Sequence, residues 1–160
     1  MTSMSIDDDI VFLERIPLLG LLGRAALRVL AIGSETRHLN AGDVLFVAGE
    51  PADAGYVIQE GSFSLLPDSA TGAAQEVTVP RGTLLGELAL MTQTVRPATA
   101  TALEPAIVIR ISRTLFLKML DGYPDAARRL RDSLMVRADQ SARDVERAKA
   151  AFARVDGEPG

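Results

Sequence analysis

The hydrophobic and polar positions follow three successive patterns along the chain, and the first predicts two short helices. Acidic residues precede the apolar run Ile10–Leu13, which favours a helix from about Asp7 to Glu14. Apolar residues then recur at helical spacing from Gly23 to Ile32 and stop at Gly33, a residue type that often ends helices. The N-terminal part of the chain is therefore expected to be helical.

The second pattern consists of short runs rich in Val, Ile, Leu, Phe and Thr, separated by glycines. Six runs have strand length and turn-forming neighbours: Val44–Val47, Tyr56–Ile58, Phe63–Leu66, Glu76–Val79, Ala98–Ala102 and Ala106–Ile111. An early strand is expected around His38, and a mobile hairpin tip over Pro67–Gln75. We expect a mainly β fold with flanking helices, a double-stranded β-helix or jelly-roll barrel.

The third pattern returns to helical spacing after Ile111. Ser112 is suited to cap a helix that continues to Leu120 and breaks at Gly122–Pro124. From Pro124 to about Val155 there is no Gly or Pro, and small or apolar residues recur every three or four positions, which predicts one long helix. Three roles are open for it: packing on the core, closing over a ligand, or pairing with a second copy of the chain.

Composition excludes several classes of protein. The 160 residues are 48% hydrophobic with a net charge of −4, which favours a globular chain over a disordered one. There is no cysteine and a single histidine, His38, so disulfides, Cys-ligated zinc and Ser-His-Asp catalysis are excluded. We expect no enzyme and no cofactor. Apolar stretches too short for a membrane span and a start without a signal-peptide pattern favour the cytoplasm.

The charge distribution argues against nucleic acid as a partner. Residues 1–90 carry five Arg against twelve Asp or Glu, and residues 121–160 carry eight of each sign, so neither end is a basic tail. A basic surplus occurs only in residues 91–120. Its members, Arg96, Arg110, Arg113 and Lys118, favour one compact anion as their partner.

One segment inside the β region carries candidate chemistry. A short helix is expected over Gly86–Met91, and Arg96 follows nine residues after Glu87. Gly86 would let a ligand approach the backbone, and free N–H groups at the helix start favour an anion. The planar guanidinium of Arg96 suits a phosphate, whereas the Glu87 carboxylate suits sugar hydroxyls. One anion and one diol together imply a ribose phosphate.

This segment resembles the phosphate-binding cassette of the cyclic nucleotide-binding domain, found in kinase A regulatory subunits, bacterial cyclic-nucleotide-gated channels and catabolite activators. The matching residues are Gly86–Leu90, then Arg96, then Ala98 and Thr99, and the resemblance extends over about residues 10–135. It implies four segments. They are N-terminal helices over 1–34, a β-barrel over 35–111 with the cassette at 86–99, hinge and lid helices over 112–155, and a tail over 156–160.

The resemblance also implies a role for each cassette residue. Arg96 would hold the cyclic phosphate and Glu87 the ribose 2′-hydroxyl, while the backbone of Gly86, Leu88 and Ala89 would line the site together with Ala98. Pro97 departs from the family, whose residue at this position often adds a backbone N–H and sometimes a hydroxyl. The missing hydroxyl favours cAMP over cGMP. Leu130, Leu134 or Met135 is expected to cap the base.

The favoured hypothesis is a stand-alone sensor that binds a 3′,5′-cyclic nucleotide and signals to a protein partner, with a homodimer through the C-terminal helix as an option. One alternative is a ligand-free interaction module, for which Pro97 is the best support. A second is the sensor part of a catabolite-activator-type transcription regulator. That would need a helix-turn-helix module after the long helix, where only residues 156–160 remain, so we expect no DNA binding.

Overall fold

The computed structural model describes residues 5–68, 75–136, 140, 143 and 147. Helices α1 (Ile6–Glu14) and α2 (Arg24–Gly33) come first, with the 3-10 turn η1 (Leu19–Leu21) between them. The strands then follow in order: β1 (Glu35–Leu39), β2 (Val44–Phe46), β3 (Pro51–Ala52), β4 (Ala54–Glu60), β5 (Phe63–Pro67), β6 (Val77–Val79), β7 (Leu84–Leu85), β8 (Thr94–Val95), β9 (Ala98–Ala102) and β10 (Ala106–Ser112). The 3-10 turn η3 (Leu88–Leu90) lies between β7 and β8, and helix α3 (Arg113–Gly122) follows β10.

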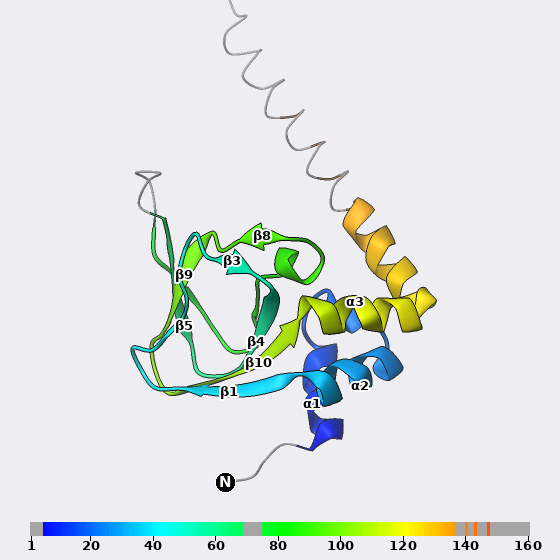
Figure 1. Ribbon diagram of the computed structural model, residues 1–160, viewed down its shortest axis with the longest axis horizontal. Helices are drawn as coiled ribbons and strands as arrows, with labels where there is room; N and C mark the ends of the chain where they lie inside the picture. The colour runs from blue at the N-terminus through cyan, green and yellow to red at the C-terminus, as the bar shows by residue number, and fades with distance from the viewer. Residues whose placement is uncertain (1–4, 69–74, 137–139, 141–142, 144–146, 148–160) are drawn as a thin grey trace, which may run out of the picture.

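The strands form two antiparallel four-stranded sheets. The helix-side sheet has the order β1-β10-β4-β7, and the far sheet has the order β2-β9-β5-β6. A short ribbon, β3 paired with β8, lies at one end of the roll, and Figure 1 shows it beside η3. The predicted fold class, mainly β with flanking helices in a jelly-roll arrangement, is confirmed. Among the described strands the sheets face each other without closing into a continuous barrel.

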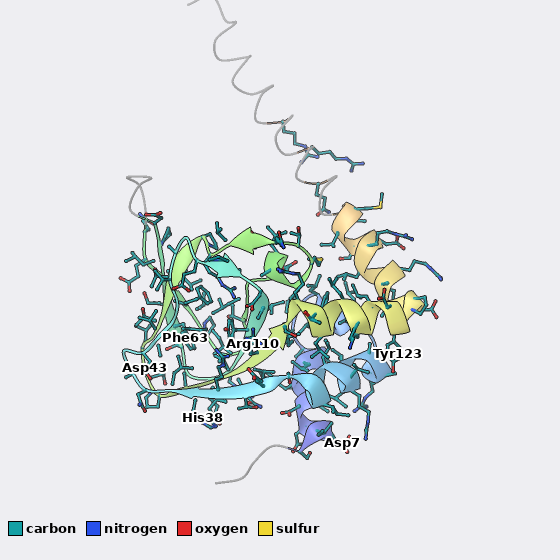
Figure 2. All side chains as sticks on the ribbon, in the orientation of Figure 1. Asp7, His38, Asp43, Phe63, Arg110 and Tyr123 are labelled. Atoms are coloured by element: carbon teal, nitrogen blue, oxygen red, sulfur yellow. The ribbon has the colours of Figure 1, made fainter. Side chains whose placement is uncertain are left out.

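The two faces of the helix-side sheet belong to different cores. Val57, Ile109 and Ile111 point outward and join one apolar cluster with residues of α1, α2 and α3. Tyr56 and Val108, on the alternate positions, point inward and join a second cluster. The far sheet completes this inner cluster with Phe46, Phe63, Ala100 and Ala102. Figure 2 shows Phe63 and Arg110 within the roll and His38 on its outside.

The predicted helices have local causes that the structure makes visible. Ser5 and Asp8 form a reciprocal capping box at the start of α1, which accounts for a helix that begins in an acidic turn. At α3, the hydroxyl of Ser112 accepts a hydrogen bond from the Leu115 amide at 3.1 Å, as the sequence predicted for this cap. Both predicted N-terminal helices are confirmed to within one residue at each end.

The predicted strands are confirmed as well, with ends shifted by up to two residues. The two-residue strands β3, β7 and β8 were not predicted. The tip of the predicted hairpin falls on residues 69–74, outside the described residues.

The C-terminal helix is described over its first part only. Residues 124–136 are helical, and Figure 1 shows them rising from the end of α3 at a steep angle to it. Most of the remaining predicted helix, up to Val155, and the tail 156–160 lie outside the described residues. Among the residues that are described, no helix combines the length and the apolar character needed to cross a bilayer.

Candidate functional site

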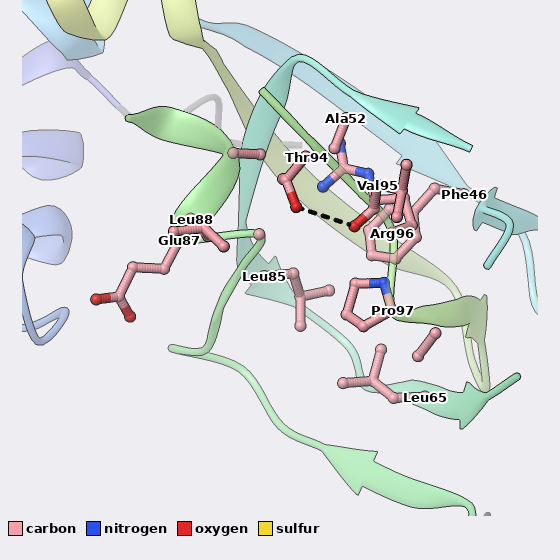
Figure 3. A pocket seen from close by; sticks show the side chains of 13 residues that line it. Phe46, Ala52, Leu65, Leu85, Glu87, Leu88, Thr94, Val95, Arg96 and Pro97 are labelled. Carbon is pink, nitrogen blue, oxygen red and sulfur yellow. Dashed lines mark hydrogen bonds between the residues drawn. The ribbon is translucent and has the colours of Figure 1, made fainter. Parts of the chain in front are cut away.

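A cavity of about 310 Å³ opens between the β3-β8 ribbon, η3 and the start of β9. Its size is within the range of about 300 to 1,000 Å³ typical of small-molecule sites. All seven predicted site residues line it: Gly86, Glu87, Leu88, Ala89, Arg96, Pro97 and Ala98. The remaining lining residues are Phe46, Ala52, Leu65, Leu85, Thr94 and Val95. Figure 3 shows the lining side chains, most of which are apolar.

Arg96 is the buried cationic residue in the lining of this cavity. Only 5% of the residue is exposed, and the centre of its guanidinium lies 4.3 Å from the ring centroid of Phe46 and 5.5 Å from that of Tyr56. These are cation-π distances, and they hold the side chain between the two sheets. Nη2 donates a hydrogen bond to the carbonyl oxygen of Ala54 at 2.8 Å. No described residue accepts a hydrogen bond from the buried Nη1.

The electrostatic position of Arg96 follows from this burial. Loss of solvent lowers the pKa of the guanidinium below its ordinary value, although the neighbouring Tyr56 and Asp53 act in the opposite direction. Arginine remains charged in proteins, so the lowered pKa means that the site holds an incompletely solvated cation. A buried cation with an unused donor is unfavourable without a partner, and an anion in the cavity would supply one.

The backbone of Arg96 is fixed on both sides. Its N–H donates to the Glu50 carbonyl at 2.8 Å, and its own carbonyl accepts from the Gly49 amide at 2.8 Å. Gly49 has φ of +89°, a conformation that suits glycine, and in this conformation the turn before β3 donates its hydrogen bond to Arg96. The rigid elements of the roll thus determine where the guanidinium lies.

Gly86 lies directly against Arg96. Its φ is +80°, and a Cβ atom at this position would be 2.5 Å from Arg96 Nη1 and 3.1 Å from the Ala54 oxygen. A side chain here would therefore displace the guanidinium. The absence of a side chain at Gly86 leaves room for the Arg96 guanidinium, and the expected approach of a ligand to the Gly86 backbone stays a prediction.

Two features of the predicted cassette differ from expectation. The helix predicted over Gly86–Met91 is only the three-residue turn Leu88–Leu90, too short for a helix dipole to favour an anion. The Ala89 amide also donates to the Gly86 carbonyl at 3.0 Å, so it is already used within this turn. The apolar spacing of Leu88, Ala89 and Leu90 did not reveal how short this turn is. Ala89 and Leu90 are buried but Leu88 is 58% exposed, so an apolar residue here does not mark a buried helix face.

Glu87 and Pro97 both line the cavity, at different places. Figure 3 shows the Glu87 carboxylate pointing away from Arg96 and Phe46, whereas Pro97 lies beside Phe46. The expected contact of Glu87 with a ribose hydroxyl stays a prediction and requires a different side-chain rotamer. Pro97 has no backbone N–H to offer a ligand.

The expectation that four basic residues share one anion is wrong. Of the four, Arg96 alone lines the described cavity. Arg110 pairs with Asp53 at 3.2 Å and Glu35 at 3.8 Å, and Lys118 is on the exposed face of α3. Burial acts to lower the pKa of Arg110, but its hydrogen bond to Tyr56 and the charge of Asp53 raise it overall. Arg110 is on β10, and Arg113 and Lys118 are on α3, so only Arg96 comes from the segment that lines the cavity.

The aromatic partners of Arg96 were not predicted as site residues. Phe46 and Tyr56 lie in predicted strands, where an aromatic residue is ordinarily a core residue. The alternation of residues along each strand predicts which side chains point into the roll. It does not predict which of these side chains contacts Arg96. Among the described residues there is no group of three or more His, Asp or Glu able to hold a metal ion.

Comparison with known proteins agrees with the fold. Residues 36–123 match the cyclic nucleotide-binding domain. A cyclic nucleotide-binding-like protein from Brucella abortus is 38% identical, with a TM-score of 0.64, over 72% of this chain and 99% of that one. The N-terminal domain of a transcriptional regulator from Streptomyces coelicolor is 28% identical, with a TM-score of 0.76, over 84% and 94% of the two chains.

Among curated relatives, an uncharacterized NTE family protein of Mycobacterium tuberculosis is 32% identical over 126 residues. That alignment covers 79% of this chain and 20% of the relative, so the chain spans about a fifth of the length of that protein. The similarity is therefore to one part of a longer protein. With the domain matched over more than half of its length, the chain belongs to the cyclic nucleotide-binding domain family.

Proposed function

We propose that this chain is a sensor that binds a 3′,5′-cyclic nucleotide, with cAMP favoured over cGMP, and signals to a protein partner. In this proposal Arg96 binds the cyclic phosphate and Glu87 binds the ribose 2′-hydroxyl. Gly86, Leu88, Ala89, Pro97 and Ala98 form the wall around the sugar and phosphate. The activity is binding rather than catalysis, and it takes place in the cytoplasm without a cofactor.

The observation that carries the proposal is the unused Nη1 donor of Arg96. It is buried against Gly86, which lines the cavity together with Arg96, at a position where any side chain would collide with it. A phosphate oxygen accepting from Nη1 would form a charge-assisted hydrogen bond, which is about twice as strong as a neutral one. The apolar lining around it suits a flat base and a sugar ring, because those groups gain from burial.

Pro97 and Glu87 determine how tightly the nucleotide is held. Without a backbone N–H at position 97, the phosphate lacks one donor, which costs about 1.5 to 3 kcal/mol or ten- to a hundredfold in affinity. Glu87 must turn toward the cavity from its present direction (Figure 3). We therefore expect weaker binding than a cassette with a complete set of donors would give.

Signalling would use the elements that follow the roll. In the proposed cycle, ligand binding shifts a population between two arrangements of the hinge after Ile111, and the C-terminal helix moves against the roll. The groove beside η3 is lined by Met91, Leu120, Leu130, Leu134 and Met135, which includes all three candidates for capping the base. The output then passes to a partner protein or to a second copy of the chain.

Calorimetric titration of the full chain with cAMP, cGMP and 5′-AMP tests the proposal. We expect binding of cAMP, weaker binding of cGMP and little of the non-cyclic nucleotide. The variant Arg96→Ala should bind cAMP at least about tenfold more weakly, because a charged donor is lost, while its far-ultraviolet circular dichroism is unchanged. Absence of heat and of any thermal shift at millimolar cyclic nucleotide would exclude the sensor.

A second candidate, the ligand-free interaction module, is favoured by the missing donor at Pro97 and by the Arg96–Ala54 hydrogen bond, which already satisfies one guanidinium nitrogen. In that case the cavity would bind no ligand, and the roll would serve to bind a partner protein. The same titration separates the two, since the module predicts no binding of any nucleotide.

A further inference from the structure

Three consecutive backbone carbonyl groups accept hydrogen bonds from Arg96, the proposed phosphate ligand, and from Arg113, the first residue of α3. They belong to Ala52, Asp53 and Ala54, where β3 passes into β4, and we call these residues the carbonyl junction. The Ala54 carbonyl accepts from Arg96 Nη2 at 2.8 Å. The Asp53 carbonyl accepts from the Arg113 backbone N–H at 2.8 Å, and the Ala52 carbonyl from Arg113 Nη1 at 2.9 Å.

Arg113 also holds the cassette turn from the other side. Its Nη1 donates to the Thr92 carbonyl at 3.0 Å and, more weakly, to the Ala89 carbonyl at 3.3 Å. Ala89 and Ala52 both line the cavity. One guanidinium nitrogen therefore joins two walls of the cavity to the helix that leaves the roll.

We propose that Arg113 is a positioning residue that holds the η3 turn and the carbonyl junction in the shape that binds ligand, and that couples this shape to the position of α3. The proposal rests on the sensor function proposed above. It assigns Arg113 no contact with the ligand, because Arg113 is absent from the residues that line the cavity.

The coupling follows from the two sides of one guanidinium. A phosphate that accepts from Arg96 Nη1 attracts the whole planar group, and Nη2 of the same group is bonded to the Ala54 carbonyl. The junction is three residues long, and a shift at Ala54 is transmitted through the backbone to Asp53 and Ala52. Both of these are bonded to Arg113, which begins α3 immediately after the Ser112 cap.

The charged groups around the junction restrict where this shift can go. The Asp53 carboxylate is paired with Arg110 of β10, and Arg110 also approaches Glu35 of β1. The Asp53 side chain is thus paired with an arginine of the helix-side sheet. The ends of the junction also belong to sheet ladders, Ala52 beside Thr94 of β8 and Ala54 beside Ser112 of β10. Within these ladders the three carbonyls accept from Arg96 and Arg113.

The test compares Arg113→Met with Arg128→Met in the full chain. Arg128 is an exposed arginine on the following helix, paired with Asp125, so it controls for loss of one arginine. Amide hydrogen exchange over residues 86–92 is measured without ligand, and cAMP affinity by calorimetry. Because the chain has no cysteine, spin labels at Thr78→Cys and Lys118→Cys report the distance between the roll and α3 with and without saturating cAMP.

We expect Arg113→Met to accelerate exchange over residues 86–92 and to raise the Kd for cAMP by about tenfold, since hydrogen bonds from a charged group are lost. The ligand-induced distance change at saturation should fall to less than half of that in the parent. Arg113→Lys, which keeps the charge with a smaller donor set, should be intermediate in all three. A purely structural role would lower stability without reducing the distance change of fully liganded protein.

The inference is overturned if Arg113→Met matches Arg128→Met in exchange, affinity and distance change. If Arg113→Met does not fold, Arg113→Lys decides, and parental behaviour in that variant overturns the inference. Failure of the parent itself to bind cyclic nucleotide would refute the sensor function. The exchange measurement then still decides whether Arg113 holds the cassette turn.

Discussion

The two faces of the helix-side sheet differ in what they bury. The outward face packs large aliphatic side chains against the helices, with Leu27, Leu30 and Ile111 fully buried. The inward face meets a far sheet on which the small residues Ala100 and Ala102 lie in one cluster with Phe46 and Phe63, and it includes Tyr56, an aromatic partner of the buried Arg96. Close packing of aliphatic side chains stabilises the outer region, whereas the inner region lies beside a cavity and a buried arginine.

This difference separates stability from binding within a single sheet. Close-packed aliphatic side chains offer a ligand no hydrogen-bond donor, and removing a buried methylene group lowers the free energy of unfolding. The inner region instead contains a cation whose Nη1 has no acceptor among the described residues. Variants on the two faces should therefore affect different measurements, and the following predictions run from the largest expected effect to the smallest.

Leu27→Ala should have the largest effect on stability and little effect on binding. Leu27 is fully buried between α1, α2 and α3, so its truncation leaves a cavity and lowers the free energy of unfolding by about 2 to 5 kcal/mol. Urea unfolding measures this loss. Calorimetry at a temperature where the variant is folded should give a cAMP affinity within about twofold of the parent, and a tenfold weaker affinity would show that the two faces are not independent.

Gly86→Ala should weaken binding because the new Cβ collides with Arg96. Gly82→Ala is the matched control, since Gly82 has φ of +88° with no atom within 4 Å of a built Cβ. Both variants carry the backbone strain of a left-handed residue, about 1 to 2 kcal/mol. Only Gly86→Ala should also raise the Kd for cAMP, by about tenfold or more. Equal affinities in the two variants would mean that Arg96 does not bind the ligand from its present position.

Pro97→Ala should act in the opposite direction and tighten binding. The substitution restores a backbone N–H beside the phosphate position, and we expect about a tenfold lower Kd for cAMP. Calorimetry measures the change directly. Unchanged or weaker binding would show that the amide at this position does not face the phosphate.

The sequence predicted the cassette residues that line the cavity better than it predicted the residues that hold them in place. The glycine, glutamate and arginine of the cassette stand at fixed spacing on one continuous segment, so all seven predicted residues line one cavity. Phe46, Ala54 and Arg113 contact Arg96 or the cassette from distant segments, and their pairing depends on sheet register. Register between strands far apart in the chain is a property of the whole fold that local patterns do not specify.

The outer region was predictable for a different reason. Helix ends are determined within a few residues, by the Ser5 and Ser112 N-caps and by Ser34 directly after Gly33, so α1, α2 and α3 follow from local chemistry. The two-residue strands β3, β7 and β8 have too few positions to show alternation. Their pairing places the walls of the cavity, which is why the shape of the site required the structure.

The most direct test of the account is a crystal structure of the full chain with cAMP. The account predicts the cyclic phosphate in the cavity beside Gly86, with one of its oxygens about 3 Å from Arg96 Nη1 and the Glu87 carboxylate turned to the ribose. A phosphate bound away from Arg96, or an empty cavity in crystals grown at saturating cAMP, would contradict it.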